Sequence, residues 1–122
     1  MTRHLAVAAL LLTLSACSKN QGLKTIEDAE SFAKARGVTL AEKKEDTQQI
    51  VSPRAFDYIT GSDVKLGINQ FNSADAAAKF KKAMDDMPLG REVFVHNGHI
   101  VFIVWGGSDV EKQKIVTALQ HP

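Results

Sequence analysis

This sequence contains a single cysteine, Cys17, among 122 residues. One cysteine excludes an intrachain disulfide, and it cannot supply the several thiolates of a cysteine-rich metal site. The chain also lacks an excess of charge of either sign, because 15 Lys and Arg face 14 Asp and Glu and give a formal net charge of +1. Proteins that bind nucleic acid usually carry a strongly basic surface, so the sequence predicts no nucleic-acid partner.

The usual catalytic motifs are missing as well. No His-Glu-x-x-His zinc motif occurs, and no serine lies in a Gly-x-Ser-x-Gly turn. Gly106 and Gly107 precede Ser108 but lack the lysine and the further glycines of a phosphate-binding loop. Asp85 and Asp86 are adjacent in a predicted helix, where neighbouring side chains point in different directions. The sequence therefore predicts a protein that is not an enzyme and that binds no metal or other cofactor.

The N-terminus has no stretch long enough to span a bilayer, since its apolar residues 5–16 fall short of the ~20 that a membrane helix needs. Arg3 before this run, and small residues at its end, are typical of a secretory signal peptide. Residues 14–17 then read Leu-Ser-Ala-Cys. This segment resembles the lipobox of bacterial lipoprotein precursors, which implies cleavage before Cys17 and attachment of lipid to that residue.

The lipoprotein resemblance divides the chain into three parts. Residues 1–16 are the expected signal peptide, residues 17–24 the lipidated cysteine and a short polar tether, and residues 25–122 a single domain. Ser18 stands where an inner-membrane retention signal carries aspartate. The resemblance therefore implies a lipid anchor in the outer membrane, with the domain facing the periplasm and the lipid on Cys17 as its only attached group.

Three segments of the domain have the apolar spacing of helices and begin at residues that cap helix N-termini. The capping residues are Thr25 with Asp28, either Asn72 or Ser73, and Ser108 with Glu111. The last helix is expected to bury Val110 together with Ile115 and Leu119.

Between the helices, alternating apolar and polar residues predict two hairpins. Residues 55–71 turn at Gly61-Ser62, and residues 92–105 turn at Asn97-Gly98. A short strand is expected at residues 38–42, and one helical turn from Pro53. Because tight turns join antiparallel strands, the sequence predicts an α+β fold of two layers: a mainly antiparallel sheet of about four to five strands with three helices packed on one face.

The Asn97-Gly98 turn also predicts which residues share a face of the second hairpin. It pairs His96 with His99 and Val95 with Ile100. One face then holds an apolar core set of Val93, Val95, Ile100, Phe102 and Val104. His96 and His99 would lie opposite each other, but two ligands are too few for a zinc site.

The other face of this hairpin is also largely apolar, which is unusual for a sheet covered by helices on one side. Its candidate partner-binding residues are Phe94, Val101, Ile103 and Trp105, and the neighbouring strand extends the face with Phe71. An exposed apolar patch with polar groups at its margin marks an interaction site. In the alternative interpretation, residues 41–59 fold over this face and bury it.

Two functions fit these patterns. The first is a lipid-anchored, non-enzymatic interaction module of the bacterial envelope, which forms a homodimer or binds a protein partner through this face. The second is a peptidoglycan- or glycan-binding module, because residues 67–77 resemble the strand-to-helix junction of SPOR-type glycan-binding domains. Residues 100–105 depart from that family, since they are hydrophobic where its members present polar contacts. A small-ligand carrier is a further possibility and would require a cavity.

Overall fold

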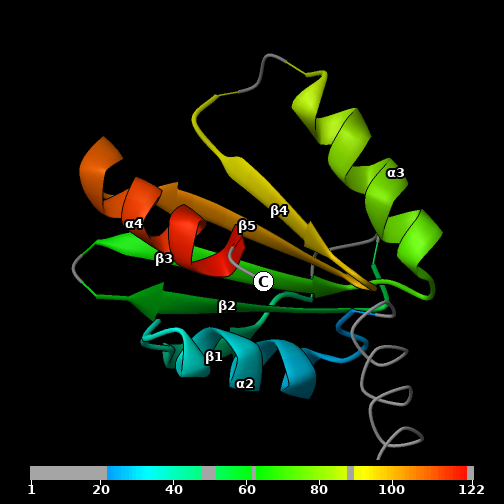
Figure 1. The fold of residues 1–122 in the computed structure, drawn as a ribbon, viewed down its shortest axis with the longest axis horizontal. Coiled ribbons are helices and arrows are strands. Elements are labelled where there is room, and N and C mark those ends of the chain that lie inside the picture. The colour runs from blue at the N-terminus through cyan, green and yellow to red at the C-terminus, as the bar shows by residue number, and fades with distance from the viewer. Residues whose placement is uncertain (1–21, 48–51, 62, 88–89, 121–122) are drawn as a thin grey trace, which may run out of the picture.

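A computed structural model describes residues 22–47, 52–61, 63–87 and 90–120. The predicted signal peptide and Cys17 lie outside the described residues. Within these residues, three helices and five strands follow one another (Figure 1). Their bounds are α2 (Ile26–Ala35), β1 (Ala41–Glu45), β2 (Arg54–Thr60), β3 (Val64–Gln70), α3 (Ala74–Asp85), β4 (Val93–Asn97), β5 (Ile100–Gly106) and α4 (Asp109–Gln120).

The five strands form one sheet in the order β1-β2-β3-β5-β4, and every neighbouring pair is antiparallel. The predicted α+β class with an antiparallel sheet is confirmed. Two boundaries differ from the sequence prediction. The first strand lies at Ala41–Glu45 rather than at residues 38–42, and β2 begins directly after Pro53, where one helical turn was expected.

Helices α2 and α4 pack on one face of the sheet and enclose the main core. The predicted core face of the second hairpin is confirmed. Ile100, Phe102 and Val104 are fully buried in this core, and Val95 is nearly so. From the helices, Ile26, Ala29 and Ala33 of α2 meet this core together with Val116 and Leu119 of α4. None of the helices in the described part of the chain is both long enough and apolar enough to cross a membrane.

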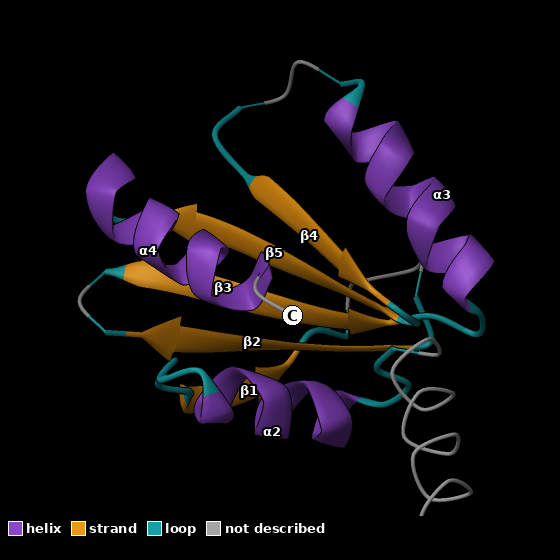
Figure 2. Ribbon diagram, viewed as in Figure 1, coloured by secondary structure: helices purple, strands orange, loops and turns teal. Residues whose placement is uncertain are grey.

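Helix α3 lies against the opposite face, beside β4 (Figure 2). Its Ala77 is completely buried and packs in one cluster with Phe71, Phe94 and Val101. The prediction that all three helices share one face is therefore wrong for α3. An apolar helical stripe predicts that a helix is packed, but it does not say on which side of the sheet.

The β4–β5 hairpin has a different register from the predicted one. Asn97 pairs with Ile100, and His96 pairs with Val101, so that Gly98 and His99 form the turn. Glycine at the first central position is typical of a two-residue hairpin turn, and Gly98 has a φ of 62°. The tip also contacts a distant segment, because the Leu23 carbonyl accepts a hydrogen bond from the His99 amide at 2.7 Å. The register differs by two residues, an even number, and each side chain therefore keeps its predicted face.

Two smaller predictions also differ. A two-residue turn at Gly61-Ser62 would pair Thr60 with Asp63, but Thr60 pairs with Val64; Ser62 itself lies outside the described residues. Val110 is 67 % exposed, although it was expected in the core. In its place, the aliphatic chain of Lys112 is buried, and its ammonium donates a hydrogen bond to the Arg91 carbonyl at 2.8 Å.

Candidate functional site

The predicted partner-binding patch is divided by α3. Phe71, Phe94 and Val101 are buried beneath this helix, so the expectation that they are exposed is wrong. Ile103 and Trp105 remain partly exposed on the same face. The alternative cover is not found in the described part of residues 41–59, because β1 and β2 join the sheet itself instead of folding over it.

The strand pairing arranges the open part of this face as neighbouring cross-strand rows. One row runs Ile59, Lys65 and Trp105 across β2, β3 and β5. The next runs Lys44, Asp57, Gly67 and Ile103 across β1, β2, β3 and β5. These rows bring one indole ring, two isoleucines and three charged side chains together on one surface. Ile103 borders the cluster beneath α3, and the rest of the surface lies beyond that helix.

Gly67 forms a low point in this surface. A Cβ atom at Gly67 would lie 3.2 Å from Asp57 Oδ1 and 3.3 Å from Trp105 Cζ3. The carboxylate and the indole thus approach each other over a position that has no side chain. A pocket of about 280 Å³ lies beside them, and its lining residues are Glu42, Lys44, Asp57, Tyr58, Ile59, Lys65 and Trp105. We call it the Trp105 pocket.

The backbone at the rim of this pocket is irregular. Glu42 has a φ of 53°, and it is the one residue other than glycine with positive φ in the described part of the chain. The pairing of β1 with β2 shifts between Ala41 and Lys44, which is a β-bulge. Strained residues and bulges cluster at functional sites, where they redirect side chains. Here the bulge lets both Glu42 and Lys44 line the Trp105 pocket.

The negative charge of Asp57 is poorly compensated by its surroundings. Partial burial raises the pKa of its carboxyl above the usual value, and the negative charge of Asp46 raises it further. The Lys44 ammonium acts in the opposite direction but does not outweigh them. A half-buried acid whose charged form is disfavoured, next to a pocket, is a candidate for ligand contact.

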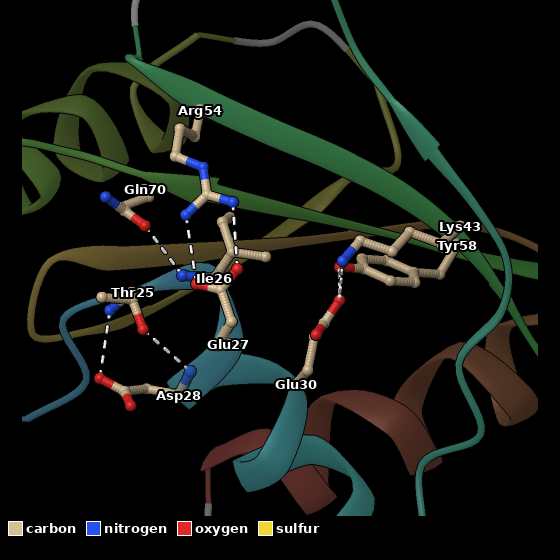
Figure 3. Close-up of polar contacts among 9 residues, drawn as sticks. All are labelled: Thr25, Ile26, Glu27, Asp28, Glu30, Lys43, Arg54, Tyr58 and Gln70. Carbon is tan, nitrogen blue, oxygen red and sulfur yellow. Dashed lines mark hydrogen bonds and ion pairs between the residues drawn. The ribbon is translucent and has the colours of Figure 1, made fainter.

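On the opposite side of β2, the acidic residue is Glu30, and its negative charge has two partners (Figure 3). The buried Tyr58 hydroxyl donates a hydrogen bond to Glu30 Oε2 at 2.6 Å, and Lys43 Nζ lies 2.8 Å from the same oxygen. Burial opposes the charged form of Glu30, but the Lys43 and Tyr58 contacts outweigh it, and the pKa of Glu30 is lowered. Burial and the Glu30 charge raise the pKa of Tyr58 well above its usual range.

Further contacts hold the start of α2 to the sheet (Figure 3). Arg54 donates two parallel hydrogen bonds to the Glu27 carboxylate, at 3.1 and 3.2 Å, which lowers the pKa of Glu27. The Gln70 side chain accepts a hydrogen bond from the Ile26 amide at 2.9 Å. Thr25 and Asp28 form the predicted capping box. This side of the sheet is therefore a structural network whose polar groups have partners.

A larger hollow of about 690 Å³ lies along one side of α4 and is lined by Asp109, Val110, Gln113, Lys114 and Thr117. All of these residues come from a single helix, and no sheet residue lines the hollow. It therefore lacks the convergence of different elements that a binding pocket usually has. The Trp105 pocket is smaller, but it combines residues of β1, β2, β3 and β5.

The two histidines of the hairpin do not lie directly opposite each other, contrary to the predicted pairing. His96 lies opposite Val101, and its Nε2 is 2.8 Å from the Gly98 carbonyl, so that this nitrogen donates a hydrogen bond to the turn. Among the residues that the structure describes, no group of three His, Cys, Asp or Glu side chains could hold a metal ion.

Residues 67–77, which resemble a SPOR-type junction, form the end of β3, a loop and the start of α3. Ser73 caps α3 as predicted, since its hydroxyl accepts a hydrogen bond from the Ala76 amide at 3.0 Å. Comparison of the chain with protein-family models, with curated proteins and with solved structures finds no match.

Sequence reasoning found Ile103 and Trp105 but missed Asp57, Gly67 and Glu42. One signal was present, because aspartate and glycine are both depleted in strands, and Asp57 and Gly67 each interrupt one. Their pairing across β2 and β3 is what makes them one site. The bulge at Glu42 had no comparable signal, since no glycine marks it.

Proposed function

We propose that this protein is a lipid-anchored, non-enzymatic interaction module of the bacterial cell envelope, which binds a protein partner at the Trp105 pocket. Lipid on Cys17 holds it to the outer membrane, with the domain in the periplasm. The observation that carries the proposal is the meeting of Trp105 and the poorly compensated Asp57 over Gly67, on the part of this sheet face that lies beyond α3.

The composition of this surface supports a protein partner. Trp105, Ile103 and Ile59 are partly exposed apolar side chains, and Glu42, Lys44, Asp57 and Lys65 surround them with charges of both signs. Protein interfaces have an apolar, often aromatic centre and a polar rim, and tryptophan is enriched among the residues that contribute most to binding. The Trp105 pocket, of about 280 Å³, lies at the lower end of the range of small-molecule sites, about 300–1,000 Å³, and its size suits one side chain of a partner.

Site-specific crosslinking in intact cells tests the proposal. A photoreactive residue at Ile103 or at Lys65 should capture the same protein, and the capture should be lost in Asp57→Asn. A probe at Lys82, which is exposed on α3, is the matched control and should not capture it. A captured second copy of this chain identifies a homodimer. Absence of capture from both Ile103 and Lys65, or equal capture from Lys82, contradicts the proposal.

Glycan binding is the second candidate, and one observation favours it. The Trp105 ring and the Asp57 carboxylate flank the same glycine, so a sugar could stack its C–H face on the indole and donate hydroxyl hydrogen bonds to the carboxylate. Co-sedimentation of the protein with purified peptidoglycan sacculi distinguishes the two candidates. Binding to sacculi that Trp105→Ala abolishes, without any captured protein, favours the glycan.

A further inference from the structure

The first described residues are fixed to the tip of the β4–β5 hairpin. The Leu23 amide donates a hydrogen bond to Asn97 Oδ1 at 3.2 Å, and the Leu23 carbonyl accepts one from the His99 amide at 2.7 Å. Figure 1 shows the start of the described chain beside this tip, near the N-terminus of α2. Leu23 was expected in the tether, but both its amide and its carbonyl form hydrogen bonds with the hairpin.

Glycines allow the two backbones to approach. A Cβ atom at Gly98 would lie 2.3 Å from the Leu23 carbonyl oxygen, and one at Gly22 would lie 2.8 Å from Asn97 Oδ1. No side chain fits at either position while this contact is kept. The contact is therefore a close backbone packing that joins the start of the domain to the hairpin tip.

This packing shortens the tether. Only four residues lie between Cys17 and Gly22, and the five steps from one Cα atom to the other span at most about 18 Å in a fully extended chain. A lipid on Cys17 thus keeps the hairpin tip close to the bilayer. Trp105 lies at the other end of β5, five residues from Ile100, which is about 17 Å along the strand.

We infer that the β4–β5 hairpin tip, packed against Leu23, is the surface that faces the phospholipid headgroups, and that the Trp105 pocket opens at the end of the sheet away from the membrane. The inference rests on the proposed lipid anchor at Cys17. It implies that the partner of the Trp105 pocket approaches from the periplasm and does not lie in the bilayer that holds the anchor.

Fluorescence quenching in vesicles tests this orientation on the full lipidated protein. Cys17 is the only cysteine and its sulfur is blocked by the lipid, so a second cysteine can be labelled selectively. Lys24→Cys places the label beside the tip, and Asp63→Cys places it in the β2–β3 loop at the far end; both residues are exposed. The vesicles contain phosphatidylethanolamine, phosphatidylglycerol and a lipid with a nitroxide on its headgroup.

The expected result is severalfold stronger quenching at position 24 than at position 63. Equal quenching, or stronger quenching at position 63, in protein whose lipid is verified by mass spectrometry overturns the orientation and leaves the lipid anchor intact. An unmodified Cys17 in the same mass measurement overturns the anchor and the orientation together.

A glycine pair tests whether the close packing sets the orientation. Gly98→Ala and Gly61→Ala both place a side chain at a similar positive φ, 62° and 65°, but only the Cβ at position 98 meets another backbone. Gly98→Ala should reduce the difference in quenching between positions 24 and 63, and Gly61→Ala should preserve it. The same difference in both variants contradicts a role for the packing.

Discussion

The two faces of β2 shift the pKa of an acidic side chain in opposite directions. Tyr58 points to the α2 side, where it and Lys43 both contact Glu30, and the pKa of that carboxyl is lowered. Asp57, the preceding residue, lies on the other face, where burial and Asp46 raise its pKa. Glu30 therefore favours the folded state in its charged form, and Asp57 opposes it. Binding at the Trp105 pocket, as proposed above, would account for an acid that costs stability at this position.

The largest expected effect contrasts the aromatic residues of the two faces. Tyr58→Ala should lower the free energy of unfolding by about 3–5 kcal/mol, because it removes a buried ring. Trp105→Ala should cost about 1 kcal/mol, since Trp105 is partly exposed. Urea denaturation of both variants provides the measurement. Equal losses would mean that Trp105 is a core residue and would remove the contrast.

The next effect concerns the α2 network. Glu30→Gln weakens the contacts with Lys43 and Tyr58 and should cost about 1–3 kcal/mol, the range for hydrogen bonds to charged groups. The exposed acid Asp86 offers a matched control, because Asp86→Asn should leave the midpoint of urea denaturation unchanged. A stability of Glu30→Gln equal to that of the unchanged protein would show that this network is not structural.

The change in the free energy of unfolding at acid pH should distinguish the two faces further. The folded-state pKa of Glu30 is lowered, so its stabilisation is complete above the ordinary value of 4.5 and is lost as the pH falls through the folded pKa. The folded-state pKa of Asp57 is raised above 3.8, so its ionisation reduces stability as the pH rises through the folded pKa. Glu30→Gln should flatten the loss of stability at acid pH, whereas Asp57→Asn should steepen it. Urea titrations across this range check both signs.

The smallest effect tests the floor of the Trp105 pocket. Gly67→Ala should change stability by no more than about 1 kcal/mol, because the φ of Gly67 suits any residue. The new methyl group would contact Asp57 and Trp105 and displace the indole slightly. Trp105 is the only tryptophan, so its emission should shift in wavelength. An unchanged spectrum would show that the ring does not lie over Gly67.

The sequence was informative where local patterns decide the structure. Alternation along residues 92–105 predicted which side chains share a face, and the capping residues Thr25 and Ser73 predicted where two helices begin. Contacts between distant segments were not predictable. The hairpin tip is bonded to Leu23, which precedes Asn97 by 74 positions. The burial of Phe94 depends on the side of the sheet that α3 takes.

The candidate site shows the same limit. Ile103 and Trp105 were found because apolar residues on a second sheet face are conspicuous in a strand pattern. Asp57 and Gly67 gain their meaning only from the pairing of β2 with β3. The pKa of Asp57 depends in turn on burial and on Asp46, neither of which is visible in the sequence around it.

The substitution Asp57→Asn, measured for both stability and partner capture, tests the central claim most directly. The amide has nearly the same shape as the carboxyl but carries no charge. If Asp57 serves binding, Asp57→Asn should unfold at the same or a higher urea concentration, and crosslinking from Ile103 in cells should be lost. A variant that is less stable and still captures its partner from Ile103 would contradict the account.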